Sequence, residues 1–283
     1  PGAAWHAHTG RANYRELVGT RETGWPCLKF KCINNELYFM GHWTPGELYL
    51  EYTSDEDGYT KATFTDRQGR RLMETDLQLS EVGTYYVYDD FGLLRYILPP
   101  KLVATLMSES EGAWIDDTSP DMDALAYIYD YNAKHQLRSR KLPGCRRERL
   151  IRDKSGNVVF TQDGNLLSRG LWKLTAYDNQ SRVAYTALVK PLAASVLEDI
   201  IPTSDLSVEY SYNSGYTLAL NELSSDSILT MNFYDSSGFA SYIAHDTSLH
   251  YVNEAGYDSR HVYLARPERS EQGLLTGRMT RVL

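Results

Sequence analysis

A short phrase that recurs along the chain constrains its fold more than any other feature. The phrase has alternating aromatic or apolar residues, then Asp, two variable residues and, in most copies, Gly. Asp favours the first position of a type I turn, and Gly at the fourth position can adopt the positive φ that closes a three-residue hairpin loop. Where the phrase begins with Tyr-x-Tyr, both rings lie on one face of a strand. Each copy therefore predicts a β-hairpin.

The copies are spread over most of the chain. The turns that six of them predict span residues 66–69, 89–92, 130–133, 153–156, 178–181 and 235–238. A seventh copy, at 210–213, is degenerate, and Ala133 and Ser181 stand where other copies have Gly. The turn residues of successive copies lie between 22 residues (213 to 235) and 41 residues (89 to 130) apart. A unit of about 20 to 25 residues fits this spacing, with inserts at the two longest steps.

The repeat also predicts the fold class. A single hairpin is only marginally stable in water, so the units must pair with one another to bury their tyrosine faces. Tyr accounts for 22 of the 283 residues, and aromatic residues favour strands. We expect an all-β fold in which antiparallel β-hairpin repeats form a meandering or spiral sheet, a partial β-shell, with one or two short helices in inserts.

The spacing predicts two regions. Residues 1–59 form a β-rich N-terminal region, whose strand-like pieces at 37–40 and 47–52 are candidates for degenerate repeats. Residues 60–283 form the hairpin-repeat region, with inserts near 101–124 and 190–205.

The inserts differ from the repeats in their pattern. In the first insert, apolar residues at helical spacing predict a short helix over 101–107, and the acidic stretch 108–123 predicts a long exposed loop. The second insert contains a helix candidate at 191–201, which ends before Pro202.

Composition excludes several classes of protein. The net charge is −8, with 29 basic and 37 acidic residues, which argues against a nucleic-acid coat, because such proteins neutralise phosphates with Lys and Arg. No apolar run approaches the roughly 18 residues of a membrane span. Because the chain opens at Pro1 without an initiator Met and stops at Leu283, we expect a piece of a longer protein.

Cysteine chemistry is not indicated. Three thiols are too few for a disulfide framework and lack the Cys-x-x-Cys spacing of a zinc site. Whether Cys27 and Cys32 are bridged stays open. Cys145 has Arg146 and Arg147 beside it, but no His is indicated as its partner. Gly-x-Ser-x-Gly is absent, and no pair of carboxylates stands out as glycosidase machinery. We expect no enzymatic activity.

Three groups of residues suggest metal binding, and each has a simpler interpretation. The acidic stretch, with Asp116, Asp117, Asp121 and Asp123, is a calcium candidate but is expected to be a solvated loop. Residues 55–58 begin like a calcium loop but lack its register, so a tight turn is expected. His6 and His8 have no third zinc ligand in sight, so a frayed terminus is expected. We predict no cofactor.

Two surface features have a binding interpretation beside a structural one. Exposed Tyr or Trp rings can stack on sugars, although Tyr recurs in the hairpins as a packing residue. A basic stretch is a candidate for docking an acidic partner or a polysaccharide, or it forms the charged sheet edge that prevents aggregation. Its members are Arg138, Arg140, Lys141, Arg146, Arg147, Arg149, Arg152 and Lys154.

The phrase Tyr-x-Tyr-Asp-x-x-Gly, followed by Arg or Leu, is similar to the YD repeat of the Rhs family. Residues 84–100 and the run 127–165 resemble the form found in large surface or secreted Rhs-type proteins of Bacteroidetes. The resemblance covers about residues 60–283. It implies repeats that wind into a β-sheet shell, which in the toxin members encloses a C-terminal effector. The self-cleavage motif of those members has no copy here, so neither effector nor protease function is carried over.

These observations lead to one function hypothesis and one alternative. The first is a non-enzymatic scaffold, a segment of an Rhs-like surface or secreted protein that encloses or displays another part of its chain. Its partners are then the remainder of that chain, and a glycan or protein at the cell surface. The alternative is a carbohydrate-binding or adhesive β-module that uses exposed Tyr and Trp. We expect an extracellular or cell-surface location and no nucleic-acid partner.

Overall fold

The computed structural model describes most of the chain and divides it into two compact units. The described residues are 12–17, 27–44, 46–54, 60–76, 82–191, 197, 201–204, 206–211, 215–217, 223–234 and 275–280. The units are residues 1–147 and 148–283, and each has its own hydrophobic core.

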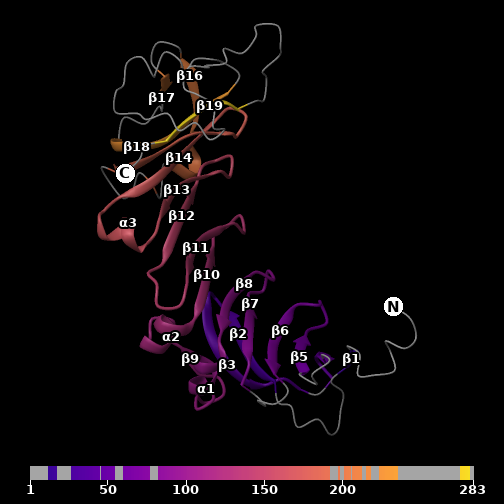
Figure 1. The fold of residues 1–283 in the computed structure, drawn as a ribbon. Coiled ribbons are helices and arrows are strands. Elements are labelled where there is room, and N and C mark those ends of the chain that lie inside the picture. The colour runs from indigo at the N-terminus through magenta and orange to yellow at the C-terminus, as the bar shows by residue number, and fades with distance from the viewer. Residues whose placement is uncertain are drawn as a thin grey trace, which may run out of the picture. The chain divides into compact units, whose positions relative to one another are not determined.

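Unit 1 contains one large sheet and one small sheet (Figure 1). The strands of the large sheet, in spatial order, are β1 (Ala12–Leu17), β4 (Tyr49–Ser54), β5 (Thr60–Thr65), β6 (Arg71–Asp76), β7 (Thr84–Tyr88), β8 (Leu94–Leu98), β10 (Tyr127–Tyr131) and β11 (Leu137–Lys141). All these neighbours are antiparallel. The small sheet has the order β2 (Leu28–Ile33), β3 (Glu36–His42) and β9 (Trp114–Ile115).

Unit 2 continues the same hairpin architecture. Its antiparallel strands are, in order, β12 (Glu148–Arg152), β13 (Val158–Gln162), β14 (Trp172–Asp178), β15 (Val183–Pro191), β18 (Leu223–Tyr234) and β19 (Leu275–Thr280). A further hairpin joins β16 (Ser207–Ser211) to β17 (Gly215–Thr217), around the degenerate copy. β16 also runs parallel to the end of β14, a pairing that the antiparallel prediction did not include.

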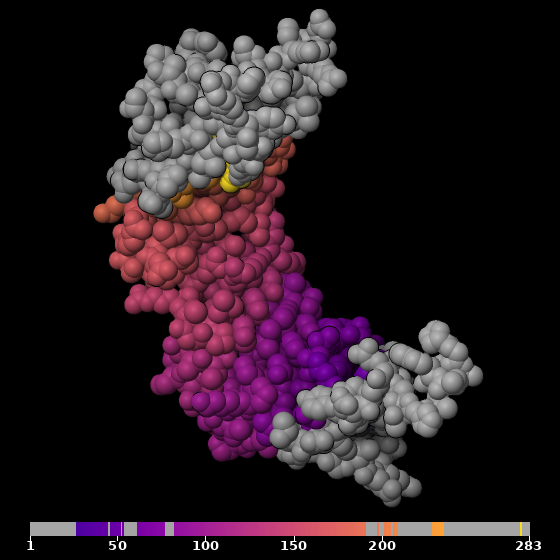
Figure 2. All heavy atoms as spheres, viewed as in Figure 1, coloured from indigo at the N-terminus to yellow at the C-terminus, as the bar shows by residue number. Residues whose placement is uncertain are grey.

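Consecutive hairpins are neighbours in space. In the space-filling view similar colours, which mark nearby residue numbers, lie side by side within each unit, as expected for a meander (Figure 2). The prediction of an all-β fold with antiparallel hairpins and short helices is therefore confirmed. The strand-like pieces expected at 37–40 and 47–52 correspond to β3 and β4.

In unit 1 the small sheet covers β7 of the large sheet. The ring of Phe30 lies 5.5 Å from that of Phe39 and 5.4 Å from that of Tyr85, measured between centroids. The Tyr85 hydroxyl accepts the N–H of Leu28 at 3.3 Å, and the Tyr96 hydroxyl donates to the carbonyl of Asn35 at 3.0 Å. The tyrosines of the inner face thus bury their rings while their hydroxyls remain hydrogen-bonded.

Three α-helices occur among the described residues. α1 (Pro100–Leu106) confirms the helix expected at 101–107, and it buries Leu102, Val103 and Leu106. α3 (Gly164–Ser168) was not expected, and Asp163 caps it by accepting the N–H of Leu166 at 2.8 Å. No described helix is long and apolar enough to cross a membrane.

The prediction of a long exposed loop at 108–123 is wrong in part. β9 lies within that range and α2 (Pro120–Leu125) begins in it, and Ile115 and Met122 are buried. Ser119 accepts the N–H of Met122, and Pro120 occupies the first helical turn. A Ser-Pro pair begins helices as well as loops, and the buried side chain of Met122 favours the helix.

The second insert is only partly described. Of the helix candidate at 191–201, Pro191 ends β15, Leu197 is buried, and Ile201 begins the 3₁₀ helix η3 (Ile201–Thr203). The rest of that candidate lies outside the described residues.

We predict that Phe30→Ala lowers the free energy of unfolding of unit 1 by about 3 to 5 kcal/mol, because it removes the ring that joins the two sheets. Phe91→Ala deletes the same side chain at a position that is 76% exposed, and should cost less than about 1 kcal/mol. Urea denaturation followed by tyrosine and tryptophan fluorescence would measure both. Equal losses in the two variants would contradict the packing described here.

Candidate functional site at the hairpin turns

Five hairpin turns share one hydrogen-bond pattern, and they begin at Asp66, Asp89, Asn132, Asp153 and Asp178. In each, the N–H of the first residue donates to the carbonyl of the residue four positions later, at 2.9 to 3.0 Å. The side-chain Oδ1 of the first residue accepts the N–H of that same later residue at 2.8 to 3.0 Å. The side chain of the repeated Asp therefore holds the turn closed from inside.

The fourth residue of each turn has a positive φ. The glycines Gly69, Gly92 and Gly156 have φ of 78°, 79° and 92°, while His135 and Ser181 both have 59°. This left-handed conformation costs an ordinary residue roughly 1–2 kcal/mol and Gly almost nothing, which is why Gly recurs there. The turns predicted at 66–69, 89–92, 153–156 and 178–181 are confirmed, and the one predicted at 235–238 lies outside the described residues.

The third turn lies two residues later than predicted, at 132–135 instead of 130–133. Asp130 belongs to β10, where it pairs with Ser139, and Asn132 supplies the Oδ1 acceptor. The later register puts His135 in the left-handed position, which His tolerates better than Ala133 would. Because strand side chains alternate with a period of two, this shift leaves the buried face unchanged.

In three hairpins the hydroxyl of the Tyr that precedes the turn residue donates to the preceding hairpin. The hydroxyl of Tyr131 donates to the carbonyl of Leu94 at 2.9 Å, and that of Tyr177 to Val158 at 3.2 Å. Tyr234 repeats the contact with the carbonyl of Val183 at 3.0 Å. In every case the acceptor is the first residue of the preceding hairpin's return strand.

In two hairpins, an Arg four positions after the turn residue contacts both the turn Asp and the Tyr of the next hairpin. The Nε of Arg70 lies 2.7 Å from Oδ2 of Asp66, and its guanidinium lies over the ring of Tyr88 in the next hairpin, 5.3 Å from the centroid. The second such Arg, Arg182, is also 2.7 Å from its turn Asp, Asp178. Each guanidinium thus joins a turn carboxylate to a neighbouring ring through an ion pair and a cation–π contact.

A polar pocket lies between the turns at 153–156 and 178–181, with a volume of about 130 Å³. Its described lining is Asp153, Ser155, Asn157, Tyr177, Asp178, Asn179, Ser181 and Ser207. Ser207 comes from β16, which runs beside the end of β14. With one aromatic residue in this lining, the pocket is not the concave aromatic patch that a sugar-stacking module requires.

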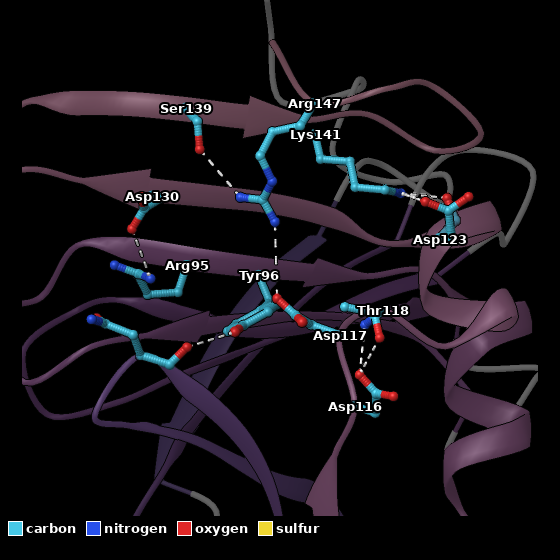
Figure 3. A network of polar contacts seen from close by, with 11 residues as sticks. Arg95, Tyr96, Asp116, Asp117, Thr118, Asp123, Asp130, Ser139, Lys141 and Arg147 are labelled. Atoms are coloured by element: carbon cyan, nitrogen blue, oxygen red, sulfur yellow. Dashed lines mark hydrogen bonds and ion pairs between the residues drawn. The ribbon is translucent and has the colours of Figure 1, made fainter. Parts of the chain in front are cut away.

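The acidic stretch and part of the basic stretch neutralise each other within unit 1 (Figure 3). Lys141 on β11 forms an ion pair with Asp123 at 3.2 Å and donates to the carbonyl of that residue in α2. Arg147 lies 3.9 Å from Asp117 and donates to the hydroxyl of Ser139 at 3.2 Å. These contacts attach the first insert to the sheet.

The remaining carboxylates of the acidic stretch do not converge. Asp116 accepts both the N–H and the hydroxyl of Thr118, at 2.9 and 2.7 Å, and these hydrogen bonds lower the pKa of its carboxyl. Asp121 is exposed. Within the described part of the chain, no group of three or more His, Cys, Asp and Glu could hold a metal ion. His6, His8 and residues 55–58 lie outside it.

Of the basic stretch, Arg138, Arg140, Arg146, Arg149 and Lys154 are exposed. Arg152, in contrast, donates to the carbonyl of Gly156 in its own turn at 2.9 Å. The aromatic side chains of Phe91 and Trp114 are also exposed, and the centroid of the Phe91 ring lies 4.5 Å from that of His135.

No protein-family model matches the chain, and no curated protein matches its sequence. The interpretation of the site therefore depends on its geometry alone. The sequence identified the turn Asp, the Tyr before it and the Arg or Leu four positions later, but not that this last residue decides whether a guanidinium fills the junction. Its signal is visible in the sequence, as Arg70, Leu93, Gln136, Asn157 and Arg182.

We predict that Asp178→Ala lowers the free energy of unfolding by about 1 to 3 kcal/mol, because it leaves the N–H groups of Gln180 and Arg182 without their acceptor. Asp178→Asn keeps Oδ1 and should cost less. Asn179→Ala, in the same turn but exposed, should change stability by no more than about 0.5 kcal/mol. Chemical denaturation of the three variants would test this, and a loss at Asn179 equal to that at Asp178 would contradict it.

The thiols give a second prediction. Cys27 and Cys32 are free and buried, and burial raises the pKa of both, whereas Cys145 is exposed. A thiol-reactive chromogenic disulfide should therefore react quickly with one thiol in the folded protein and with three in denaturant. Only one reactive thiol in denaturant would show that Cys27 and Cys32 are bridged.

Proposed function

We propose that the chain is a non-enzymatic structural scaffold, a hairpin-repeat segment of an Rhs-like surface or secreted protein that encloses or displays another part of its chain. One observation carries the proposal: the repeated Tyr-Asp pair is structural. Asp closes its own turn, while Tyr donates to the backbone of the preceding hairpin. The residues that recur are thus those that hold successive hairpins together.

The chemistry of the repeated positions supports this role. The turn Asp accepts hydrogen bonds from the backbone of its own turn, and Tyr131, Tyr177 and Tyr234 donate to the backbone of the preceding hairpin. These side chains therefore stabilise the hairpin array. Burial raises the pKa of Tyr131 and of Tyr177 above the ordinary value, at which a Tyr hydroxyl is already protonated at neutral pH, so both hydroxyls are donors there. An extended sheet assembled in this way offers surface and edges to a partner, which is what an enclosing or displaying scaffold requires.

The alternative is a carbohydrate-binding or adhesive module. The exposed Trp114 and Phe91, 53% and 76% accessible, are the observation in its favour, because such rings can stack on pyranose faces. They belong to different elements, β9 and the turn at 89–92, and neither lines the polar pocket. The scaffold therefore remains the function that the geometry supports best.

A thermal-shift screen of the purified chain against a glycan panel, with calcium and EDTA as controls, separates the two functions. A ligand at 100 times its dissociation constant stabilises a fold by about 2.7 kcal/mol, which such a screen detects. The scaffold predicts no saturable shift with any glycan. A shift that Trp114→Ala or Phe91→Ala abolishes would replace the scaffold by the binding module.

A further inference from the structure

Two hairpin junctions share an internal arrangement of three groups. A turn Asp, an Arg four positions later and the Tyr of the next hairpin lie together, with the guanidinium between carboxylate and ring. For Arg182 the Nε lies 2.7 Å from Oδ2 of Asp178, and the guanidinium carbon lies 4.3 Å from the centroid of Tyr234. The junction of Asp66, Arg70 and Tyr88 is built in the same way.

The junction at 153–156 has two of these groups and lacks the third. Asp153 is the turn residue and Tyr177 is the Tyr of the next hairpin, but Asn157 stands where the other two junctions have Arg. The Nδ2 of Asn157 reaches Oδ2 of Asp153 at 3.3 Å, a longer contact than the 2.7 Å of the Arg junctions. Asn157 therefore replaces the hydrogen bond only weakly, and it brings no charge.

The carboxylate of Asp153 is more enclosed than a charge without a counter-ion usually is. The residue is 5% exposed, and among the ion pairs of the described residues none involves it. The adjacent Arg152 directs its guanidinium to the carbonyl of Gly156 instead. Asp89, whose turn also lacks an Arg, is partly exposed. Burial of a carboxylate is unfavourable unless a cation or several hydrogen bonds compensate it.

The missing guanidinium coincides with a cavity. The polar pocket of about 130 Å³ is lined by Asp153, Asn157 and Tyr177, the three positions that define the junction. Its volume is well above the roughly 15 Å³ that a single water molecule requires. No Lys or Arg is among its described lining residues, so it does not suit a phosphate or another anion.

We propose that this pocket binds a guanidinium group from outside the hairpin array, between the carboxylate of Asp153 and the ring of Tyr177. The ligand takes the place that Arg70 and Arg182 occupy in their own junctions. Ser155, Ser181 and Ser207 supply further hydroxyl acceptors around it. The group belongs either to a small guanidino compound or to an Arg side chain of a protein partner, since both present the same planar cation.

The binding test uses the purified whole chain and methylguanidinium as the probe. We expect saturable NMR shifts of the backbone amides at Ser155 and Asn157 at low millimolar probe. Methylammonium should require at least a tenfold higher concentration, because it cannot form the planar paired contact. Methylurea has nearly the same shape but no charge, and should give no saturable shift. A response to methylurea equal to that of methylguanidinium would overturn the proposal.

Two substitutions test the site itself. Asp153→Asn should weaken methylguanidinium binding at least tenfold while the hairpin stays folded, because Asn132 supports the same turn with an amide. Asn157→Arg should place a guanidinium in the pocket from within the chain, which abolishes probe binding and raises the melting temperature. Unchanged binding in either variant would overturn the proposal. None of these results depends on whether the chain acts as a scaffold.

A final comparison identifies the source of the group. A blocked Gly-Arg-Gly peptide that binds at least tenfold more tightly than methylguanidinium points to an Arg side chain of a protein. Equal affinities point to a small guanidino compound. Either result supports the guanidinium site, whereas the absence of binding by both probes would exclude it.

Discussion

The hydrogen bond from a turn N–H to the Oδ1 of a residue four positions earlier is the interaction on which the rest of the structure depends. It closes five hairpins with the same geometry, and therefore sets the same strand register in each. The register places alternate side chains on the inner face, where Tyr85 and Tyr96 bury their rings. The same register brings the Tyr before the turn residue to the preceding hairpin. Local turn chemistry thus controls long-range packing.

Charge has a different role in unit 1 from its role at the turns. The first insert carries a run of carboxylates that repel one another, yet Lys141 and Arg147 hold it against β11 (Figure 3). Lys141 is 6% exposed, and it both neutralises Asp123 and donates to that residue's carbonyl, so its buried ammonium is compensated twice. Removal of that Lys would take away one of the two donors to the Asp123 carbonyl, because the N–H of Gly144 also donates to it at 3.1 Å, and would leave the Asp123 carboxylate, which is 65% exposed, to the solvent.

Much of the fold was predictable because hairpin turns depend on neighbouring residues. Three turns followed directly from Asp and Gly, and the turn at 178–181 from Asp178 and the spacing, with Ser181 in place of Gly. The third turn required a choice between Asp130 and Asn132 that depends on which residue adopts the left-handed conformation. α2 was missed because a Ser-Pro pair begins both loops and helices, and only the burial of Met122 decides between them. The pocket could not be predicted at all. It exists because Asn157 meets the Tyr of a different hairpin, and that contact is tertiary.

Tyr131, Tyr177 and Tyr234 each donate to a backbone carbonyl of the preceding hairpin, and this affects how such arrays can change in length. Tyr131 contacts Leu94 across the insert that contains α1 and α2, and Tyr234 contacts Val183 across a comparably long one. A carbonyl is present whatever the side chain, so the contact imposes no sequence requirement on the preceding hairpin. As far as this contact is concerned, whole hairpins can therefore be duplicated, deleted or separated by new segments without a compensating substitution. With respect to this hydrogen bond the array is modular, so the side chains around one Tyr–carbonyl contact can change independently of those around another.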